Sequence, residues 1–341
     1  MPNHPRNITF PPFSHLLASA TRRKGLFPMT TETHGHPIFS WPPKPREIAT
    51  VLFGFPGLLW PWPALYLAVA VLQWWAIGAS VFEGDVSPIA FVELFAVNLL
   101  ALVTFVLAFH YFLYVRRTQG LKYKYSRQWP EKHNRRFIYA NELLEGVFLS
   151  CGSAVGVWTV YTFALLWMYH NQMLPGAGTD TNLFWSAVTF LLFPFWANVH
   201  FYFTHRWLHG RVLGKFHRVH HKAKDISPWS GLSMHPVEHL IYFSAVPIFV
   251  LIVPTHPVLM IYFMVASALG PTTLHHGFAA IKLGKGRTMM TDHYHHYLHH
   301  QFGQANFGAT NLVPLDLWLK TDYQTMQQRK SKAPVEGLET T

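Results

Sequence analysis

Cysteine is nearly absent from the sequence. The single copy, Cys151, lies within an apolar stretch of the 341-residue chain. A lone cysteine cannot form an internal disulfide, and thiolate zinc sites and iron–sulfur clusters need several cysteines. The sequence therefore excludes a disulfide scaffold and sulfur-based metal or redox centres.

Charged residues are also scarce. They make up 13% of the chain, whereas hydrophobic residues make up 50%. This composition is too apolar for an ordinary soluble domain and predicts insertion into a membrane. We expect the net charge of +11 to set the orientation in the membrane and to meet anionic lipid head groups, and we expect no nucleic-acid binding.

Long apolar runs divide the chain into expected membrane segments. A membrane-crossing helix needs roughly 20 apolar residues. Four stretches meet this length, at about 60–82, 88–115, 146–169 and 183–204. A fifth apolar region, 240–270, is interrupted by VPTHP from Val253 to Pro257, and proline breaks helical hydrogen bonding. We expect this region to form two short half-spans, a hairpin that dips into the membrane and returns.

Loop charges predict which side of the bundle faces the cytosol. Lysine and arginine prefer the cytosolic side of short loops. The loop 116–136 holds eight of them, whereas 83–87 and 170–182 hold none. With 116–136 inside, the histidine-rich segments 205–239 and 271–341 also lie in the cytosol. The predicted fold is an all-α integral membrane bundle with a cytosolic, histidine-rich helical cap.

The N-terminal segment differs in composition from the rest. Residues 1–48 are polar and rich in proline, without a long apolar run before a small-residue cleavage site, so a secretory signal peptide is not expected. We interpret 1–48 as a flexible tail and 49–341 as a single membrane domain. Met29 offers an alternative start, and the sequence alone does not choose between Met1 and Met29.

Histidine is the outlier of the composition. The chain has 23 histidines, and 16 of them lie between His200 and His300. Spacings of three and four residues, which place side chains on one helical face, recur in HRWLH, HRVHH and HYLHH. Their histidines are His205 and His209, then His217, His220 and His221, then His296, His299 and His300. Closely packed imidazoles repel when protonated unless a metal ion replaces the protons, so we predict metal binding.

The number and type of these side chains limit which metal ions, and how many, the site can bind. Imidazole suits iron, zinc, copper or nickel, whereas magnesium and calcium prefer oxygen ligands. Eight or more histidines exceed the four ligands of one tetrahedral ion, so two ions are expected. In LHHGF we expect His276 to be a ligand and His275 its neighbour. Further candidates, as ligands or as hydrogen-bond partners of ligands, are His235, Glu238, His239, His275, Asp292, His293 and His295.

These motifs resemble the fatty acid hydroxylase and sterol desaturase superfamily of membrane non-haem di-iron enzymes. The resemblance rests on THRWLH, on KFHRVHHKAKDISPWSGLSMHPVEH, on HHGF and on HYLHHQFGQANFGATNLVPLD, and it covers roughly Trp185 to Thr321. It implies that the iron ligands are His205, His209, His217, His220, His221, His276, His296, His299 and His300. It also implies that the HPVE turn and the segment Asn306, Phe307, Gly308 shape the site beside Asp316.

The sequence departs from the family pattern at two positions. His239 adds a histidine after HPVE, and Lys320 stands where the family commonly has glycine. The first departure puts the ligand count in doubt, and the second affects only a local turn.

The resemblance further implies the reaction, the substrate class and the source of electrons. Two iron ions, for which zinc can substitute in a structure, would use O2 to hydroxylate or desaturate a lipid at the cytosolic face. A sterol or sterol-like substrate is the first expectation, and a fatty-acyl or other lipid hydroxylase is the second. Electrons would come from an external ferredoxin or cytochrome, because the sequence has no flavin or nicotinamide fingerprint.

Two other classes stay open from the sequence. Membrane helices with histidines are also found in metal transporters, although transport ligands should lie near the middle of the membrane. A non-catalytic lipid-binding module is the other alternative.

Overall fold

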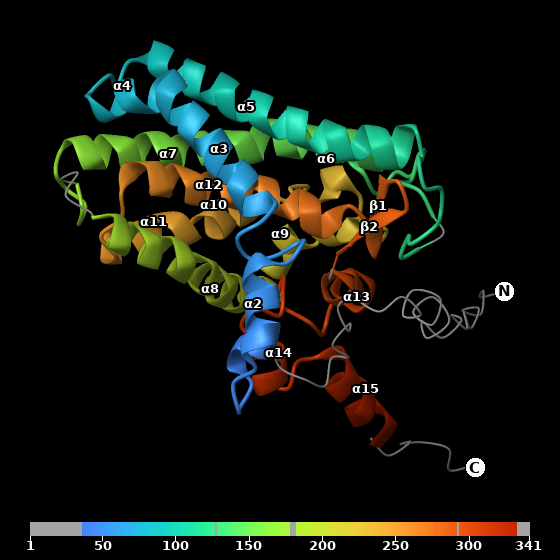
Figure 1. Ribbon diagram of the computed structural model, residues 1–341. Helices are drawn as coiled ribbons and strands as arrows, with labels where there is room; N and C mark the ends of the chain where they lie inside the picture. Colours follow the sequence, from blue (N-terminus) through green and yellow to red (C-terminus); the bar gives the residue numbers. More distant parts are fainter. Residues whose placement is uncertain (1–35, 127, 178–181, 292, 333–341) are drawn as a thin grey trace, which may run out of the picture. The chain divides into compact units, whose positions relative to one another are not determined.

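The computed structural model describes residues 36–126, 128–177, 182–291 and 293–332 (Figure 1). Most of the expected tail lies outside these ranges. Its described end contains a short turn, η1 Pro37–Phe39, and helix α2 Pro45–Phe53. Regular structure therefore begins slightly earlier than the expected boundary at residue 48.

Five helical segments are long and apolar enough to cross a membrane. They are Trp62–Phe82 (α3 Trp62–Gln73, η2 Trp74–Gly78, α4 Ala79–Phe82), Pro88–Val115 (α5 Pro88–His110, η3 Tyr111–Val115), Glu142–His170 (α6 Glu142–Phe148, η5 Leu149–Ala154, α7 Val155–His170), α8 Leu183–Leu208 and α12 Pro257–His275. The four expected spans are all among them, so the prediction of a helical membrane bundle is confirmed.

Local sequence explains where these helices begin. Ser87 precedes Pro88, and its side chain accepts a hydrogen bond from the backbone N–H of Ala90. Asn182 caps α8 in the same way by accepting from Trp185. Such caps satisfy backbone donors that have no partner inside the helix.

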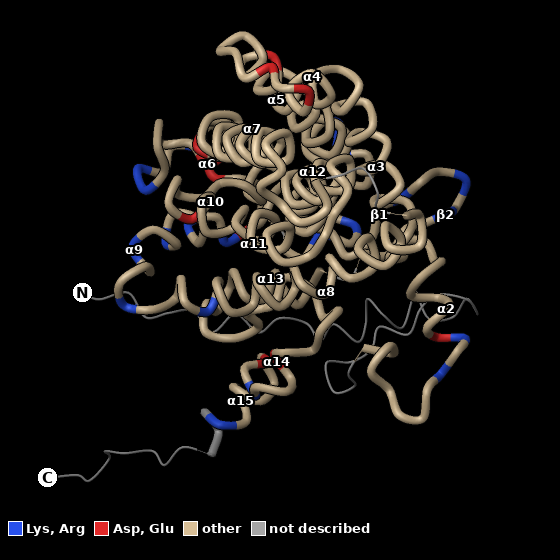
Figure 2. Tube along the Cα trace, turned by 90° about the vertical axis from the view of Figure 1, so that its left-hand side faces the viewer, with Lys and Arg blue, Asp and Glu red and all other residues tan. Residues whose placement is uncertain are grey.

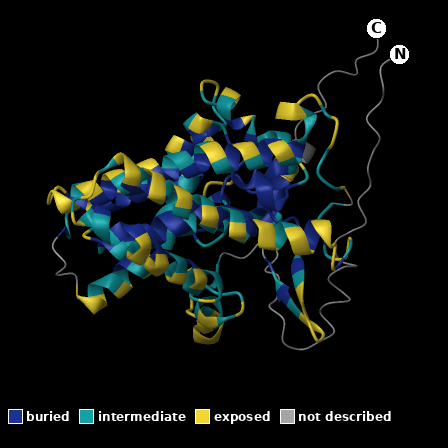
Figure 3. Ribbon diagram, turned by 90° about the horizontal axis from the view of Figure 1, so that it is seen from above, coloured by how far each residue is buried: buried dark blue, intermediate teal, exposed yellow. Residues whose placement is uncertain are grey.

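The outer faces of the long helices are apolar. Figure 2 shows little charge along α3, α7 and α12, and Figure 3 shows exposed residues along the outer sides of the helices. Leu100 and Phe184 are large apolar side chains with exposed fractions of 68% and 77%. A surface of this kind is stable in lipid rather than in water. The chain is an integral membrane protein.

The core of the bundle forms around α12. This helix packs against α3, α5, α7 and α8. Leu94, Trp158 and Phe263 are fully buried, and the rings of Phe193 and Phe263 stack with centroids 3.9 Å apart. The firm packing of α12 and α8 fixes the position of the histidines at their C-terminal ends.

The region expected as a shallow hairpin differs from the prediction. It forms α10 Pro236–Phe243, α11 Ala245–Ile252 and α12, and the turn between α11 and α12 lies at the far end of the bundle. There the Tyr169 hydroxyl donates to the carbonyl of Thr255 at 2.8 Å, and the Trp185 indole donates to that of Pro254 at 2.7 Å. The 17 residues of 236–252 span about 25 Å at 1.5 Å per residue. The helical hairpin and its break at VPTHP were therefore predicted correctly, but its arms are longer than half-spans, and α12 is long enough to cross a membrane.

Short elements gather at the histidine-bearing end of the bundle. They are η4 Ile138–Ala140, α9 Gly214–His217, η6 His220–Lys222, η7 Pro228–Ser230, β1 Ala280–Gly284, β2 Arg287–Met290, α13 Tyr294–Phe302, α14 Leu315–Trp318 and α15 Tyr323–Lys332. The antiparallel pair β1–β2 was not predicted and is the one described departure from an all-α fold.

The basic loop 116–136 lies at this same end. The Tyr114 hydroxyl, just before the loop, donates to the carbonyls of Ile226 and His276, both at 3.0 Å. The Gln119 side chain bonds to Ala280 and Lys282 of β1. Lysine and arginine of the loop and the histidine-rich segments therefore share one end of the bundle.

Candidate metal centre

Nine histidines form two compact groups. The first group contains His205, His209, His217, His221 and His299, and the second contains His220, His275, His296 and His300. Within each group, one ring nitrogen of every histidine lies within 4.8 Å of those of all the others. Seven of the nine side chains are buried. The three sequence clusters thus converge, although they are far apart along the chain.

Adjacent histidines are divided between the groups. His220 belongs to the second group and His221 to the first, while His299 belongs to the first and His300 to the second. We expected the histidines of each cluster to share one helical face. His205 and His209 do lie in one group, but the histidines of HRVHH and of HYLHH are each divided between the two groups. In HRVHH the helix α9 ends at His217 and a separate turn, η6, begins at His220. In α13, neighbours such as His299 and His300 point about 100° apart around the helix axis.

The ring nitrogens are unusually close within each group. In the first group the Nε2 atom of His217 lies 3.0 Å from those of His205 and His209. The Nε2 atom of His299 lies 3.1 Å from that of His209 and 3.0 Å from that of His221. In the second group the Nε2 atom of His275 lies 3.1 Å from that of His300 and 3.2 Å from that of His296.

Hydrogen bonds at the opposite ring nitrogen fix the protonation of several rings. The Nδ1 atoms of His205 and His299 donate to the carbonyls of Phe307 and Ala305, both at 2.7 Å. Those of His275 and His300 donate to the carbonyls of Pro271 and Ala223, at 2.9 and 3.1 Å. A carbonyl only accepts, so the proton of each neutral ring is on Nδ1 and a lone pair is left on Nε2. In the second group, His275 and His300 therefore bring two lone pairs together.

Burial keeps these rings neutral. It lowers the pKa of His209 to about 4 and the pKa of His299 to about 3, well under the ordinary value of 6.5. Burial, followed by the effect of neighbouring histidines, also lowers the pKa of His217, His221 and His300 well below 6.5. Protonation at neutral pH therefore cannot relieve the repulsion between lone pairs.

This arrangement fits a transition-metal ion in each group. Two ligands held about 2.1 Å from one ion and at right angles to each other lie about 3.0 Å apart, which matches the short Nε2–Nε2 distances. Neutral imidazole with Nδ1 fixed by a carbonyl or carboxylate is the usual form of a metal-binding histidine. The donor set suits iron, zinc or copper and disfavours magnesium and calcium.

The histidine pair at the end of α12 differs from the expectation. We expected His276 as a ligand and His275 as its neighbour, but His275 joins the second group and His276 does not. The Nδ1 atom of His276 instead accepts from the backbone of Phe278 at 3.1 Å, and its ring stacks on Phe109. Adjacent residues of a helix point in different directions, and only the direction of His275 leads to His296 and His300.

One of the further candidates orients a ring of the first group. Glu238 accepts from Nδ1 of His217 at 2.7 Å, and both side chains are almost fully buried. A carboxylate in this position fixes the ring and increases its basicity as a ligand.

A second carboxylate, Asp316, organises the segment beside the first group. It accepts from the backbone N–H groups of Phe307 and Gly308 and from the Thr321 hydroxyl, at 2.9, 2.8 and 2.7 Å. The Nε2 atom of His295 lies 3.2 Å from Oδ2, the oxygen that also accepts from Gly308. These bonds hold the Phe307 carbonyl, which accepts from His205, in place.

The other candidates lie outside both groups. His235 caps α10 by accepting from Val237, and His239 is bonded to Ser153 and to the carbonyl of Leu232. The ring of His293 lies 5.9 Å from that of His276. Asp292 lies outside the described residues.

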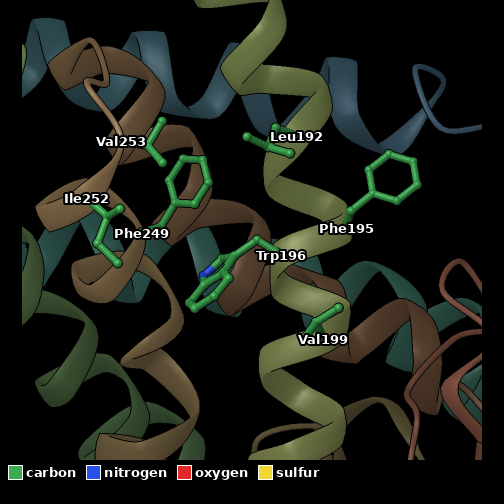
Figure 4. Close-up of a pocket in the computed structure, with 7 residues that line it drawn as sticks. All are labelled: Leu192, Phe195, Trp196, Val199, Phe249, Ile252 and Val253. Atoms are coloured by element: carbon green, nitrogen blue, oxygen red, sulfur yellow. The ribbon is translucent and has the colours of Figure 1, made fainter.

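An apolar groove of about 290 Å³ lies between α8 and α11 (Figure 4). Its lining includes Trp196 and Phe249, and the Trp196 indole donates to the carbonyl of Ala245 at 2.8 Å. Trp196 and His205 are nine residues apart, which is two and a half helical turns. The groove therefore lies on the opposite side of α8 from the histidine groups.

Comparison with known proteins identifies the segment that carries the groups. Residues 190–321 match the family model described as fatty acid hydroxylase. The chain is 27% identical to Delta(7)-sterol 5(6)-desaturase ERG3B of Gibberella zeae over 136 residues, which cover 36% of this chain and 38% of the relative. It is 27% identical to human lathosterol oxidase over 129 residues, or 37% of this chain and 42% of the relative.

The match is limited to part of each protein. The chain is also 27% identical to Delta(7)-sterol 5(6)-desaturase ERG3 of Saccharomyces cerevisiae, over 34% of this chain and 33% of the relative. It thus spans less than half the length of these three relatives. No solved structure matches the chain. All nine histidines of the two groups lie within 190–321. This segment matches the fatty acid hydroxylase family model, and the chain is similar over part of its length to sterol desaturases.

Proposed function

We propose that the chain is a membrane-bound oxidoreductase that uses two iron ions and O2 to hydroxylate or desaturate a lipid. The observation that carries this proposal is the approach of His275 and His300. Their Nε2 atoms, each with a lone pair, lie 3.1 Å apart, while both Nδ1–H groups donate to carbonyls. A cation between the rings removes their repulsion. The family of the segment 190–321 supports oxidation of a lipid as the reaction.

The chain's own residues have distinct roles in this proposal. The first ion would be held by His205, His209, His217, His221 and His299, and the second by His220, His275, His296 and His300. Glu238 and the carbonyl acceptors keep Nδ1 protonated and aim Nε2 at the ion. When bound, the two ions would supply the activation of O2 that removal of hydrogen from an unactivated C–H bond requires. Burial of the rings keeps bulk water away from the reacting carbon.

A sterol-like lipid is the proposed substrate, with a fatty-acyl lipid as the runner-up. The relatives named as sterol desaturases and lathosterol oxidase support the first choice. The apolar outer faces of the long helices let such a substrate remain in the bilayer until it meets the histidine groups at the end of α8 and α12. We also propose that residues 49–341 form a single functional domain.

We place the site on the cytosolic side. The basic loop 116–136 shares the histidine end of the bundle through Tyr114 and Gln119, and lysine-rich and arginine-rich loops prefer the cytosol. Two reducing electrons then come from an external ferredoxin or cytochrome, for which the basic loop is a suitable docking surface. A metal transporter is disfavoured, because its ligands should lie near the middle of the membrane rather than at helix ends.

Lipid analysis of cells with and without the protein tests the function. The wild type should generate a hydroxylated or newly unsaturated lipid, detected by mass spectrometry. His220→Ala and His299→Ala should abolish that product while the protein still accumulates in the membrane. His170→Asn, at an exposed histidine that ends α7 and belongs to neither histidine group, is the matched control and should retain the product. Product formation by either alanine variant at the wild-type level would contradict the proposal.

A further inference from the structure

One aromatic ring contacts both histidine groups. The ring centroid of Phe201 lies 4.8 Å from that of His205 in the first group and 6.3 Å from that of His296 in the second. Among the described residues, no other phenylalanine, tyrosine or tryptophan has a recorded ring contact to members of both groups. Phe307, for example, contacts only rings of the first group.

The position of Phe201 in α8 places it on the membrane side of the groups. It precedes His205 by one helical turn, which is about 6 Å along the axis, and the two side chains share one face of α8. The groups lie at the end of this span, whereas Phe201 lies inside it. A lipid that approaches from the bilayer therefore meets Phe201 immediately before the histidines.

Neighbouring helices hold the ring in place. Tyr242 of α10 packs edge-on against Phe201 with centroids 6.1 Å apart. The Tyr242 hydroxyl donates to the carbonyl of Ser267 in α12 at 2.8 Å. Three helices thus fix the Phe201 ring, which remains partly exposed and offers an apolar surface with no hydrogen-bonding group.

We propose that Phe201 is a specificity-determining residue, whose ring contacts the hydrocarbon of the lipid substrate and fixes which carbon stands before the two histidine groups. This inference rests on the proposed function. A rigid aromatic face next to both groups restricts the depth and tilt of a hydrocarbon chain or ring system by van der Waals contact. The carbon that is oxidised is then the one that projects past the ring.

Three variants separate this role from general effects on folding. Phe201→Ala removes the contact surface, and Phe201→Leu keeps most of the apolar volume in case the alanine variant does not fold. Phe203→Ala is the matched control, because Phe203 lies on the same helix but is 53% exposed. The variants are compared in the full-length protein, in host membranes and in purified form.

Two readouts are needed. The first is the lipid product profile by mass spectrometry: we expect the ratio of the main product to other positional or substrate products to change about 10-fold to 100-fold in Phe201→Ala. Phe201→Leu should change it less, and Phe203→Ala should retain the wild-type ratio. The second readout is the binding of cobalt to the metal-free protein in the absence of lipid. The number of cobalt ions bound and the visible spectrum should be the same in all three variants as in the wild type, because Phe201 has no hydrogen bond to a histidine.

The outcomes distinguish the two proposals. A wild-type product ratio in a folded Phe201 variant would overturn the role of Phe201 while the proposed function stands. An altered cobalt spectrum in both Phe201 variants would show that the ring supports the metal centre, and this would also overturn the specificity role. If the wild type itself forms no oxidised lipid, the proposed function fails and the specificity role fails with it.

Discussion

Glu238 holds the ring of His217 from the side opposite to the histidine group. The Oε1 atom of Glu238 lies 2.7 Å from Nδ1 of His217, whereas Nε2 of His217 lies 3.0 Å from the Nε2 atoms of both His205 and His209. A buried carboxylate thus sets the direction of a ring that sequence spacing alone could not orient.

We expect Glu238→Gln to weaken metal binding without breaking the fold. Glutamine keeps the size of the side chain but cannot ionise, so it cannot supply the negative charge that would increase the basicity of the His217 ring when an ion is bound. Replacement of such a partner typically lowers metal affinity about 10-fold to 100-fold. Competition between a cobalt chelator and the purified protein measures this change. Glu47→Gln, on the exposed helix α2, should bind cobalt like the wild type, and equal affinity in both variants would argue against the role of Glu238.

The division of His220 and His221 between the groups predicts different effects of two neighbouring substitutions. His221→Ala should weaken the first site, and His220→Ala should weaken the second. Each variant should retain about one of the two ions, because a site that loses one ligand binds far more weakly than an intact one. Cobalt absorption spectra should differ between the two variants, since each reports the site that is still filled. Identical spectra, or loss of both ions in both variants, would contradict two separate sites.

The pair at the end of α12 gives a direct test of the revised ligand set. His275→Ala removes a ring whose Nε2 atom lies 3.1 Å from that of His300, so it should empty the second site and abolish lipid oxidation. His276→Ala removes a ring that accepts from Phe278 and stacks on Phe109 but belongs to neither group. The folded fraction of this variant should therefore still bind two cobalt ions per chain. The family resemblance alone predicts the reverse order. Metal analysis of both purified variants decides between these outcomes.

The apolar runs made the membrane helices predictable from sequence. Pro88–Val115 begins and ends where the expected span 88–115 did, and the other expected spans agree within a few residues. The reason is physical: only an apolar run of sufficient length crosses a bilayer. The depth of the 240–270 hairpin was not predictable in this way, because it depends on bonds from Tyr169 and Trp185 to the turn.

The histidines were predictable as candidates but not as two groups. Spacing identified all the members of the two groups apart from His275. The sequence places His275 next to His276 and does not indicate which of the two is the ligand. The choice depends on the end of α12 and on the carbonyl of Pro271, which accepts from His275. Phe201 carried no signal at all, since phenylalanine is common in membrane helices and its importance comes only from contacts with His205 and His296.

Acidification is expected to destabilise the metal-free protein. Burial lowers the pKa of His299 to about 3 and that of His209 to about 4, whereas an ordinary histidine titrates near 6.5. Between these values the unfolded chain binds more protons than the folded chain, so the free energy of unfolding falls as the pH falls. The stabilising contribution is fully present above pH 6.5 and is lost progressively down to the folded-state pKa values.

Thermal unfolding of the metal-free protein in lipid nanodiscs measures this dependence. The unfolding midpoint should be lower at about pH 5 than at about pH 7.5. The variant His299→Gln cannot be protonated at this position, so its midpoint should fall less over the same range. A midpoint that does not change with pH in the wild type would mean that the histidines titrate alike in the folded and unfolded chains, and the neutral, buried rings proposed as ligands would then lose their physical basis.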